Sequence, residues 1–259
     1  MNMVDTHAHI FAEQFKDDLT EVVLRANNAG VKKILLPNID ELSIADLKSC
    51  VTQYPELFVP MMGLHPTSVS TDWKQQLDII YKELDSSDYI AVGEIGVDLY
   101  WDKSLQTEQI NAFEEQLKWS AEKDLPVSIH FRNATKEVIN SIKRVGEESL
   151  RGVFHSFGGS KDELDNILQL NNFMIGVNGV VTYKNSGMTE TLIHCPKDRL
   201  VMETDSPYLT PVPYRGKRNE SSYLCYIVNK ISEIWGLEVI EVNRLINQNV
   251  NKMFGLNII

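Results

Sequence analysis

Hydrophobic residues in this chain gather in eight short runs, and longer segments of amphipathic, helix-like pattern follow most of them. Runs such as IAVG, LFVPMM and LVM are continuously apolar, which is typical of parallel strands that are buried on both faces. The expected strands are Met3–Ile10, Lys32–Ile39, Leu57–Pro66, Tyr89–Asp98, Pro126–Arg132, Arg151–Phe157, Phe173–Val181 and Leu200–Pro207. The expected helices are Asp17–Ala29, Leu42–Gln53, Trp73–Leu84, Leu105–Lys123, Lys136–Arg144, Lys161–Leu170, Ser222–Trp235 and Val239–Phe254, and an irregular stretch follows the seventh strand.

Eight strands that alternate with helices predict an α/β fold, a (β/α)8 TIM barrel. An open, doubly wound sheet is the competing architecture. It usually carries a Gly-rich phosphate loop after its first strand, where this chain has histidines instead. No Pro/Gly/Ser-rich hinge, internal repeat or low-complexity segment divides the 259 residues. We therefore expect residues 1–259 to form a single domain.

Charge and cysteine usage narrow the possible functions. The net charge of -11 argues against a general nucleic-acid coat, which needs a basic surface, although a bound divalent metal would add positive charge locally. The three cysteines are widely spaced and form no CxxC motif, so they predict neither a disulfide framework nor a thiolate zinc site. With no secretory signal and no apolar run near the ~20 residues that span a bilayer, we expect a cytoplasmic protein without a membrane or obligate protein partner.

Candidate metal ligands stand near the C-terminal ends of the expected strands. The stretch DTHAH sets Asp5, His7 and His9 at alternate positions, so on a strand the two histidines face the same way with Asp5 behind them. Four further polar residues follow apolar runs: Glu94, His130, His155 and Asp205. Active sites of barrels assemble at these strand ends. As separate core residues each group would need its own partner, at a cost of about 1–3 kcal/mol if unsatisfied, whereas one metal centre would satisfy them together.

The donor set predicts two metal ions rather than one. Four histidines and two carboxylates exceed the roughly three protein ligands of a tetrahedral catalytic metal, and they suit two divalent ions about 3.5–4 Å apart with Glu94 as the bridge. A water between the ions would act as nucleophile, and Asp205 would orient it and take its proton. Imidazole donors favour zinc or manganese over magnesium.

The chain resembles the TatD-type metal-dependent deoxyribonucleases, which lie within a wider superfamily of metal-dependent hydrolases. The matching stretches run from end to end of the chain: DTHAH (Asp5–His9), GLHP (Gly63–Pro66), VGEIGVDLYW (Val92–Trp101), SIHFRNA (Ser128–Ala134), FHSFGGS (Phe154–Ser160), GVVTYKN (Gly179–Asn185), METDSPYLTP (Met202–Pro211) and YRGKRNE (Tyr214–Glu220). One departure is Asn133, where the family commonly has aspartate.

This resemblance implies a (β/α)8 fold and exonuclease-type hydrolysis of phosphodiester bonds in DNA, with magnesium often named as cofactor. Carried over by position, it implies two ligand sets: His7, His9, Glu94 and Asp205 for one metal, and Glu94, His130 and His155 for the other. The alternative function is hydrolysis of a small-molecule ester, amide or phosphoester within the wider superfamily. Such enzymes often bridge their metals with a carboxylated lysine near the end of the fourth strand, where this chain has Glu94 and no lysine before Lys103. A third alternative, a non-catalytic binding protein, predicts that at least one ligand is missing, and none is missing.

A compact basic cluster follows the eighth strand, where barrel phosphate sites often lie. It consists of Arg215, Lys217 and Arg218, and Gly216 within it lets backbone approach a ligand. We expect this cluster to hold substrate phosphate, since guanidinium groups suit phosphate geometry. The alternative is a solvated loop, as most short charge runs are.

Further residues near the expected mouth have two interpretations each. His65 could bond a substrate phosphate or form a His-Pro turn, and Arg132 could neutralise phosphate or pair with a helix carboxylate. Glu203 alternates with Asp205 and should share its face as a partner of the ligands, while Asp5 is expected to support the ligands without binding metal. Three aromatic residues could stack on bases or pack in the rim: Tyr100, Trp101 and Tyr208.

Overall fold

Parallel strands form the centre of the fold within residues 1–258, which the computed structural model describes. Eight strands follow one another along this part of the chain: β1 (Met3–Asp5), β2 (Val31–Pro37), β3 (Phe58–Met61), β4 (Val92–Gly96), β5 (Val127–His130), β6 (Gly152–Phe154), β7 (Phe173–Val177) and β8 (Leu200–Met202). Strands β1 to β3 form one arc and β4 to β8 the other, each in sequence order and with parallel pairing throughout. The side chains on these strands are almost all buried, as their apolar sequences require.

Two short backbone seams join the arcs into a closed barrel. Ala8 pairs with Ser206 between the first and last strands, and Met62 pairs with Val92 between β3 and β4. At the first seam the amide of His9 donates to the carbonyl of Ser206 at 2.7 Å. The barrel predicted from the sequence is thus confirmed, and its first seam lies beside the DTHAH segment.

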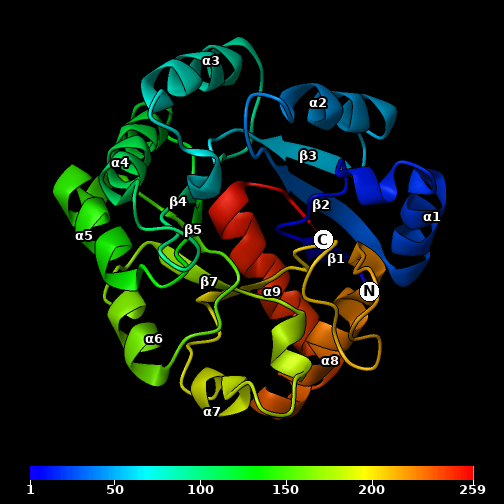
Figure 1. The fold of residues 1–259 in the computed structure, drawn as a ribbon. Helices are drawn as coiled ribbons and strands as arrows, with labels where there is room; N and C mark the ends of the chain where they lie inside the picture. The colour runs from blue at the N-terminus through cyan, green and yellow to red at the C-terminus, as the bar shows by residue number, and fades with distance from the viewer. Residues whose placement is uncertain (259) are drawn as a thin grey trace.

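Helices surround the strands, as Figure 1 shows. One follows each strand: α1 (Leu19–Ala29), α2 (Ile44–Gln53), α3 (Trp73–Ser86), α4 (Gln106–Lys123), α5 (Thr135–Val145), α6 (Lys161–Leu168), α7 (Met188–Leu192) and α8 (Leu224–Trp235). Short 3-10 turns lie at Glu13–Phe15, Pro66–Ser68, Glu147–Ser149, Gly179–Thr182 and Ser221–Tyr223. The helices pack apolar faces on the barrel, as α8 does through Ile227, Val228 and Ile231. None of the helices in the described part of the chain has both the length and the hydropathy that a bilayer span requires.

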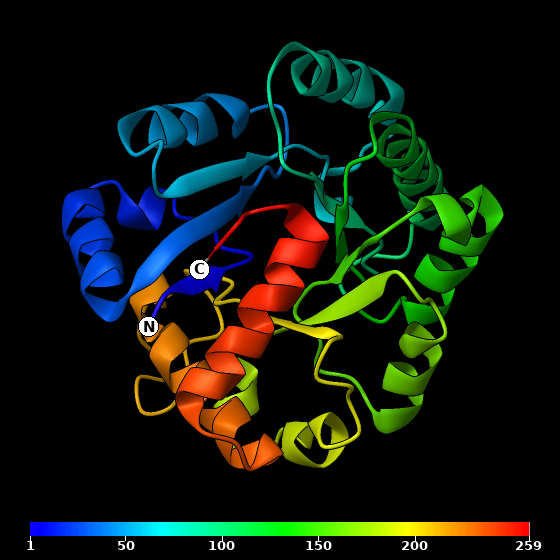
Figure 2. The same ribbon diagram turned by 180° about the vertical axis from the view of Figure 1, so that it is seen from behind.

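A ninth helix, α9 (Val239–Phe254), crosses the end of the barrel at which the strands begin, as Figure 2 shows. The side-chain amides of Asn243 and Asn247 donate to the carbonyl of Asn2, just before β1. The amide of Asn249 donates to the carbonyl of Leu200, the first residue of β8. Because α9 covers this end, the opposite end, where the strands finish, is the one left for a site.

The strands are shorter than the sequence predicts. The first ends at Asp5, the seventh at Val177 and the eighth at Met202, so the polar residues that follow lie in turns and not on strands. Asp205 adopts a left-handed φ of 57°, which lies outside the region of regular strands. The expected irregular stretch after the seventh strand contains a 3-10 turn and the short helix α7. The predicted strands are too long because an apolar run indicates which residues are buried. Residues beyond the last hydrogen bond between the strands are still buried.

Candidate metal centre

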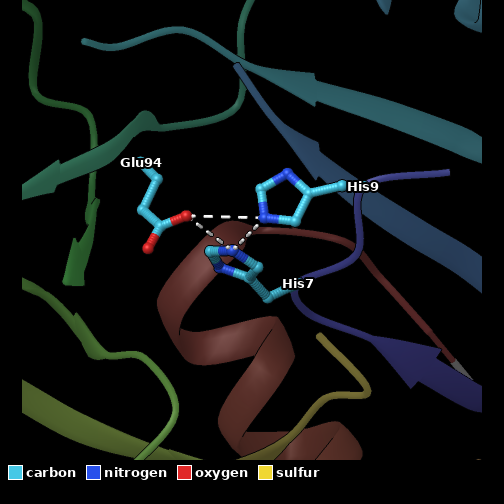
Figure 3. Close-up of side chains that lie close together, drawn as sticks. All are labelled: His7, His9 and Glu94. Atoms are coloured by element: carbon cyan, nitrogen blue, oxygen red, sulfur yellow. Dashed lines mark hydrogen bonds and ion pairs between the residues drawn. The ribbon is translucent and has the colours of Figure 1, made fainter. Parts of the chain in front are cut away.

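The carboxylate of Glu94 on β4 lies at the middle of the candidate site. Its Oε2 is 3.1 Å from Nε2 of His7 and 3.5 Å from Nε2 of His9. Figure 3 shows these three side chains turned toward one another, with the histidines coming from the segment that follows β1. The two Nε2 atoms are 3.3 Å apart, so alternation brings both rings to one face although the strand has already ended.

The other oxygen of Glu94 faces three further imidazoles. Oε1 is 2.9 Å from Nδ1 of His130, 3.4 Å from Nε2 of His65 and 3.8 Å from Nε2 of His155. Five of the six histidines of the chain therefore surround one carboxylate. Gly96 permits the backbone of His130 to lie close to β4, because a Cβ there would lie 1.9 Å from the carbonyl oxygen of His130.

Asp205, which follows β8, lies between the histidines that face Oε2 of Glu94 and those that face Oε1. Its Oδ1 lies 3.7 Å from Nε2 of His9 and 3.7 Å from Nε2 of His155. The amide of Asp205 donates to the carbonyl of His7 at 2.9 Å, so the barrel seam itself sets this distance. All six residues that the sequence proposed as ligands lie together at the mouth.

Asp5 lies beneath these side chains and touches backbone. Its Oδ1 accepts from the amide of Thr204 at 2.8 Å and from the amide of His7 at 3.4 Å. Burial raises the pKa of Asp5 to about 7, even though these hydrogen bonds act in the opposite direction. Asp5 thus fixes the two chain segments that carry His7 and Asp205 relative to each other.

Two of the ring nitrogens that face away from Glu94 lie close to polar side chains, whereas the buried Nδ1 of His9 has no hydrogen-bond partner. Nδ1 of His7 lies 3.0 Å from the hydroxyl of Ser128, and Nδ1 of His155 lies 2.9 Å from Oε1 of Glu203. A Cβ on Gly176 would lie 2.3 Å from the Glu203 carboxylate, so glycine makes room for it. Such partners hold a ligating ring in one orientation and one tautomer.

Asp98 is a functional residue that the sequence reasoning missed. Its Oδ2 is 2.8 Å from Nε2 of His130, the nitrogen opposite the one that faces Glu94. Asp98 stands four residues after Glu94 in the same motif, GEIGVD. A second acid at the end of the strand that carries Glu94 was the available signal. Ser128 was missed as well, and a lone serine inside an apolar strand carries no comparable signal.

The charges in the cluster depend strongly on one another. Burial disfavours the imidazolium of His155, but the carboxylates of Glu203, Asp205 and Glu94 outweigh it and raise its pKa to about 10. For His7, burial and the neighbouring His155 together hold the pKa well below the usual range. The rings of His7 and His155 stack with centroids 3.4 Å apart, so two imidazolium charges there would repel strongly.

This donor set fits divalent metal. Three groups of histidine nitrogens and carboxylate oxygens each lie within 4.8 Å of one another: His7, His9 and Glu94; His7, His155 and Glu203; and His65, Glu94 and His130. Buried imidazole and carboxylate donors that converge in this way are costly without a cation to share.

Comparison with known proteins agrees with this geometry. A family model described as TatD related DNase matches residues 4–255. The chain belongs to the TatD family. A metal-dependent hydrolase, YabD of Bacillus subtilis, is 35% identical over 98% of this chain and 100% of its own. TatD of Pectobacterium carotovorum, named a 3'-5' ssDNA/RNA exonuclease, is 32% identical over 98% of this chain and 100% of its own.

A solved structure extends the family assignment to the fold. The crystal structure of YJJV, a TatD homologue from Escherichia coli, matches with a TM-score of 0.91 at 28% identity and covers 98% of both chains. The resemblance seen in the motifs is therefore confirmed, and the TatD-family protein is a metal-dependent hydrolase.

The basic cluster of this TatD-family chain divides among different partners. Arg218 turns back toward α1 and pairs with Asp18 through both guanidinium nitrogens, at 2.7 Å each. Arg215 instead lies over the ring of Tyr183, 4.4 Å from its centroid. Lys217 also lies near an aromatic ring in the same loop. The three cations thus do not form one patch, and Arg218 is engaged in holding the loop.

His65 and Arg132 are placed differently from each other. His65 faces Glu94 and is also held by Thr67, whose hydroxyl is 2.7 Å from its Nδ1. The guanidinium carbon of Arg132 lies 3.7 Å from the ring centroid of Tyr100. Within residues 1–258 Arg132 makes no ion pair, so pairing with a helix carboxylate, one of its two expected interpretations, is not observed.

Proposed function

We propose that this TatD-family hydrolase is an exodeoxyribonuclease that cleaves phosphodiester bonds at DNA ends, and that it works with two divalent metal ions. One observation carries the proposal: a single buried carboxylate, Glu94, turns one oxygen to His7 and His9 and the other to His130 and His155. Two ions that share a carboxylate suit a displacement at phosphorus, where both the attacking and the leaving oxygen need stabilising. The exonuclease name of the Pectobacterium relative supports the same substrate class.

The ligand sets follow from which atoms face Glu94. Nε2 of His7, Nε2 of His9 and Oε2 of Glu94 would hold one ion, with Asp205 beside them. Oε1 of Glu94, Nδ1 of His130 and Nε2 of His155 would hold the other. When bound, such ions supply Lewis acidity toward the phosphodiester and toward water. The imidazole donors favour zinc or manganese, while the family resemblance implies magnesium.

The two carboxylates have different roles because their environments differ. Burial alone would raise the pKa of Glu94, but the surrounding histidines outweigh it and hold that pKa well below the usual range, so Glu94 stays ionised as a ligand. Burial raises the pKa of Asp205 to about 6, against the opposing effect of His155 and His9. Oδ1 of Asp205 lies 3.7 Å from Nε2 of His9 and 3.7 Å from Nε2 of His155, so this carboxylate would reach a water molecule held between the two histidine groups and accept its proton. Asp205 is therefore the proposed general base.

Substrate phosphate would be held at the mouth by the cations that the fold leaves available. We assign this role to Arg215, Lys217 and Arg132, and to His65, which is 13% exposed and lies beside Glu94. Arg218 contributes indirectly, because its pair with Asp18 holds the loop that carries Arg215 and Lys217. The catalytic domain in this proposal is the whole chain, residues 1–259.

End-labelled single-stranded DNA provides the test. Metal-free protein is supplied with magnesium, manganese or zinc, and we expect progressive shortening of linear strands and no cleavage of circular single strands. His9→Ala should abolish the activity. His194→Ala is the matched control, because this exposed histidine is the one outside the cluster. Absence of cleavage with all three metals would overturn the proposal, and turnover of small esters or amides instead would favour the alternative function.

A further inference from the structure

An exposed aromatic surface lies beside the candidate metal centre, formed by Tyr100, Trp101 and Arg132; we call it the aromatic shelf. Tyr100 is 51% exposed and Trp101 is 72% exposed. Their rings meet edge to face with centroids 4.9 Å apart, and the Arg132 guanidinium lies 3.7 Å from the first centroid and 5.2 Å from the second. Large aromatic side chains this exposed gain little from packing in the protein. The Arg132 guanidinium covers one face of the Tyr100 ring, so the more exposed ring of Trp101 is the aromatic face that the shelf offers to a ligand.

The shelf is attached to the metal centre through one carboxylate. Asp98 uses Oδ2 to contact Nε2 of His130 at 2.8 Å. Its Oδ1 accepts from the amide of Tyr100 at 2.9 Å and lies 3.5 Å from the amide nitrogen of Trp101. Because the same side chain holds a proposed ligand and both shelf amides, the shelf has a set position relative to the reacting phosphodiester.

Backbone contacts strengthen this attachment. The amide of Leu99 donates to the carbonyl of Arg132 at 2.9 Å, which joins the segments after β4 and β5. Arg132 itself stands two residues after His130. The backbone amide of Asp98 donates to the buried side chain of Gln109 at 2.8 Å, so the backbone at Asp98 is anchored from α4. The loop that carries the shelf is therefore tied on several sides.

We propose that the aromatic shelf stacks a nucleobase of the strand whose end phosphodiester lies at the metal centre. This inference rests on the proposed function and adds the element that holds the base. A planar guanidinium and exposed aromatic faces both stack on bases, and every base has a suitable face, so such a platform needs no sequence preference. It also suits a chain with a net charge of -11, because stacking secures a strand without a basic surface.

The test compares two proteins on two substrates, in the manner of a double-mutant cycle. Wild type and Trp101→Ala are each assayed on a linear single strand and on the same strand with abasic residues at its last three positions. We expect Trp101→Ala to lower kcat/KM on the normal strand roughly 5- to 100-fold, as loss of base stacking does. For wild type, kcat/KM on the abasic strand should be lower than on the normal strand by a similar factor. For Trp101→Ala, kcat/KM should be the same on both strands. Trp101→Phe, which keeps a flat face, should recover most of the loss.

Controls separate stacking from folding and from the proposed function. Ile240→Ala removes a side chain that is 73% exposed on α9, at the covered end of the barrel, and should change neither substrate's kinetics. Equal losses for Trp101→Ala on normal and abasic strands, or no loss on either, would overturn the shelf proposal while cleavage itself persists. If wild type cleaves neither strand, the proposed function fails. In that case the Kd values of the same two proteins for the same two strands are measured by fluorescence anisotropy in the presence of a chelator, which tests the shelf without cleavage. Equal Kd values for all four combinations would exclude stacking on the shelf.

Discussion

Asp98 and His130 are joined by a contact of 2.8 Å between a carboxylate oxygen and Nε2, which leaves Nδ1 of the histidine facing Glu94. Burial disfavours the imidazolium of His130, but the carboxylates of Asp98 and Glu94 outweigh it and raise its pKa to about 9, so the metal-free ring carries a proton on each nitrogen. A metal ion on the Glu94 side would take the place of the proton on Nδ1, and Asp98 would hold the remaining proton on Nε2. With the proton on Nε2, Nδ1 has a free lone pair for metal. Asp98 therefore acts through His130 as a positioning residue.

Replacing Asp98 by Asn should weaken metal binding without removing a ligand. An amide cannot accept from both His130 and Tyr100, so either the ring orientation or the following loop is disturbed. Loss of such a partner lowers metal affinity about 10- to 100-fold. Calorimetric titration of metal into apoprotein measures this, with Asp102→Asn as the control, an acid in the same loop that contacts Ser104. Unchanged affinity in Asp98→Asn would contradict the positioning role.

Glu94→Gln should reduce metal content and activity together. The glutamine amide keeps one oxygen, so it can offer a metal-binding oxygen to only one of the two histidine groups. We expect the bound metal to fall from the proposed two ions per chain to one or fewer, and activity to fall roughly 1000-fold because metal stabilisation is worth several kcal/mol. Elemental analysis after dialysis and a cleavage assay measure the two effects. Retention of two ions in the variant would show that Glu94 is not the shared ligand.

The basic loop should show two kinds of behaviour. Arg215→Ala should weaken single-strand binding equally for all sequences and reduce the slope of log affinity against log salt by about 0.7 for each phosphate that the protein no longer neutralises. Arg218→Ala should leave that slope unchanged and instead destabilise the fold by up to about 1 kcal/mol, since its charge is already paired with Asp18. Filter binding across salt concentrations and urea unfolding measure these effects. A reduced salt slope in Arg218→Ala would return this residue to the phosphate site.

The Asp18 pair should make stability depend on pH at the acid end. The hydrogen bonds from Arg218, with help from Arg25, lower the pKa of Asp18 from 3.8 to about 2, against a smaller effect of burial. Because the folded-state pKa is the lower one, the stabilisation is complete above about pH 4 and is lost as pH falls toward 2. Asp18→Asn should therefore cost up to about 1 kcal/mol at pH 7, a figure reduced for solvent exposure.

Urea midpoints measured between pH 3 and pH 8 follow this effect. The difference between wild type and Asp18→Asn should be constant above pH 5 and shrink below pH 4. Asp17→Asn removes the exposed neighbouring charge and is the matched control. A difference that persists undiminished at pH 3 would mean that packing, and not the ion pair, stabilises this turn.

Much of the fold and the ligand set could be predicted from the chain. Continuous apolar runs reported the eight buried strands, and the helices began and ended within a few residues of the predicted positions. His7, His9, Glu94 and Asp205 were found because polar residues directly after buried strands in a barrel meet at one mouth. Strand ends were less predictable, since burial extends beyond the hydrogen-bonded ladder into the turns that carry His7 and Asp205.

The amino-acid sequence by itself determined the barrel, the residue types at its mouth and the family to which the chain belongs. Only the tertiary structure decided how those residues are held. The contact of His7 with Ser128 joins positions 121 residues apart, and Arg218 meets Asp18 across 200 residues. Hydrophobic pattern reports whether a side chain is buried, but it carries no information on which distant polar group faces that side chain. The path of the backbone around the closed barrel sets those distances, and it placed five histidines on one carboxylate and an aromatic shelf beside them.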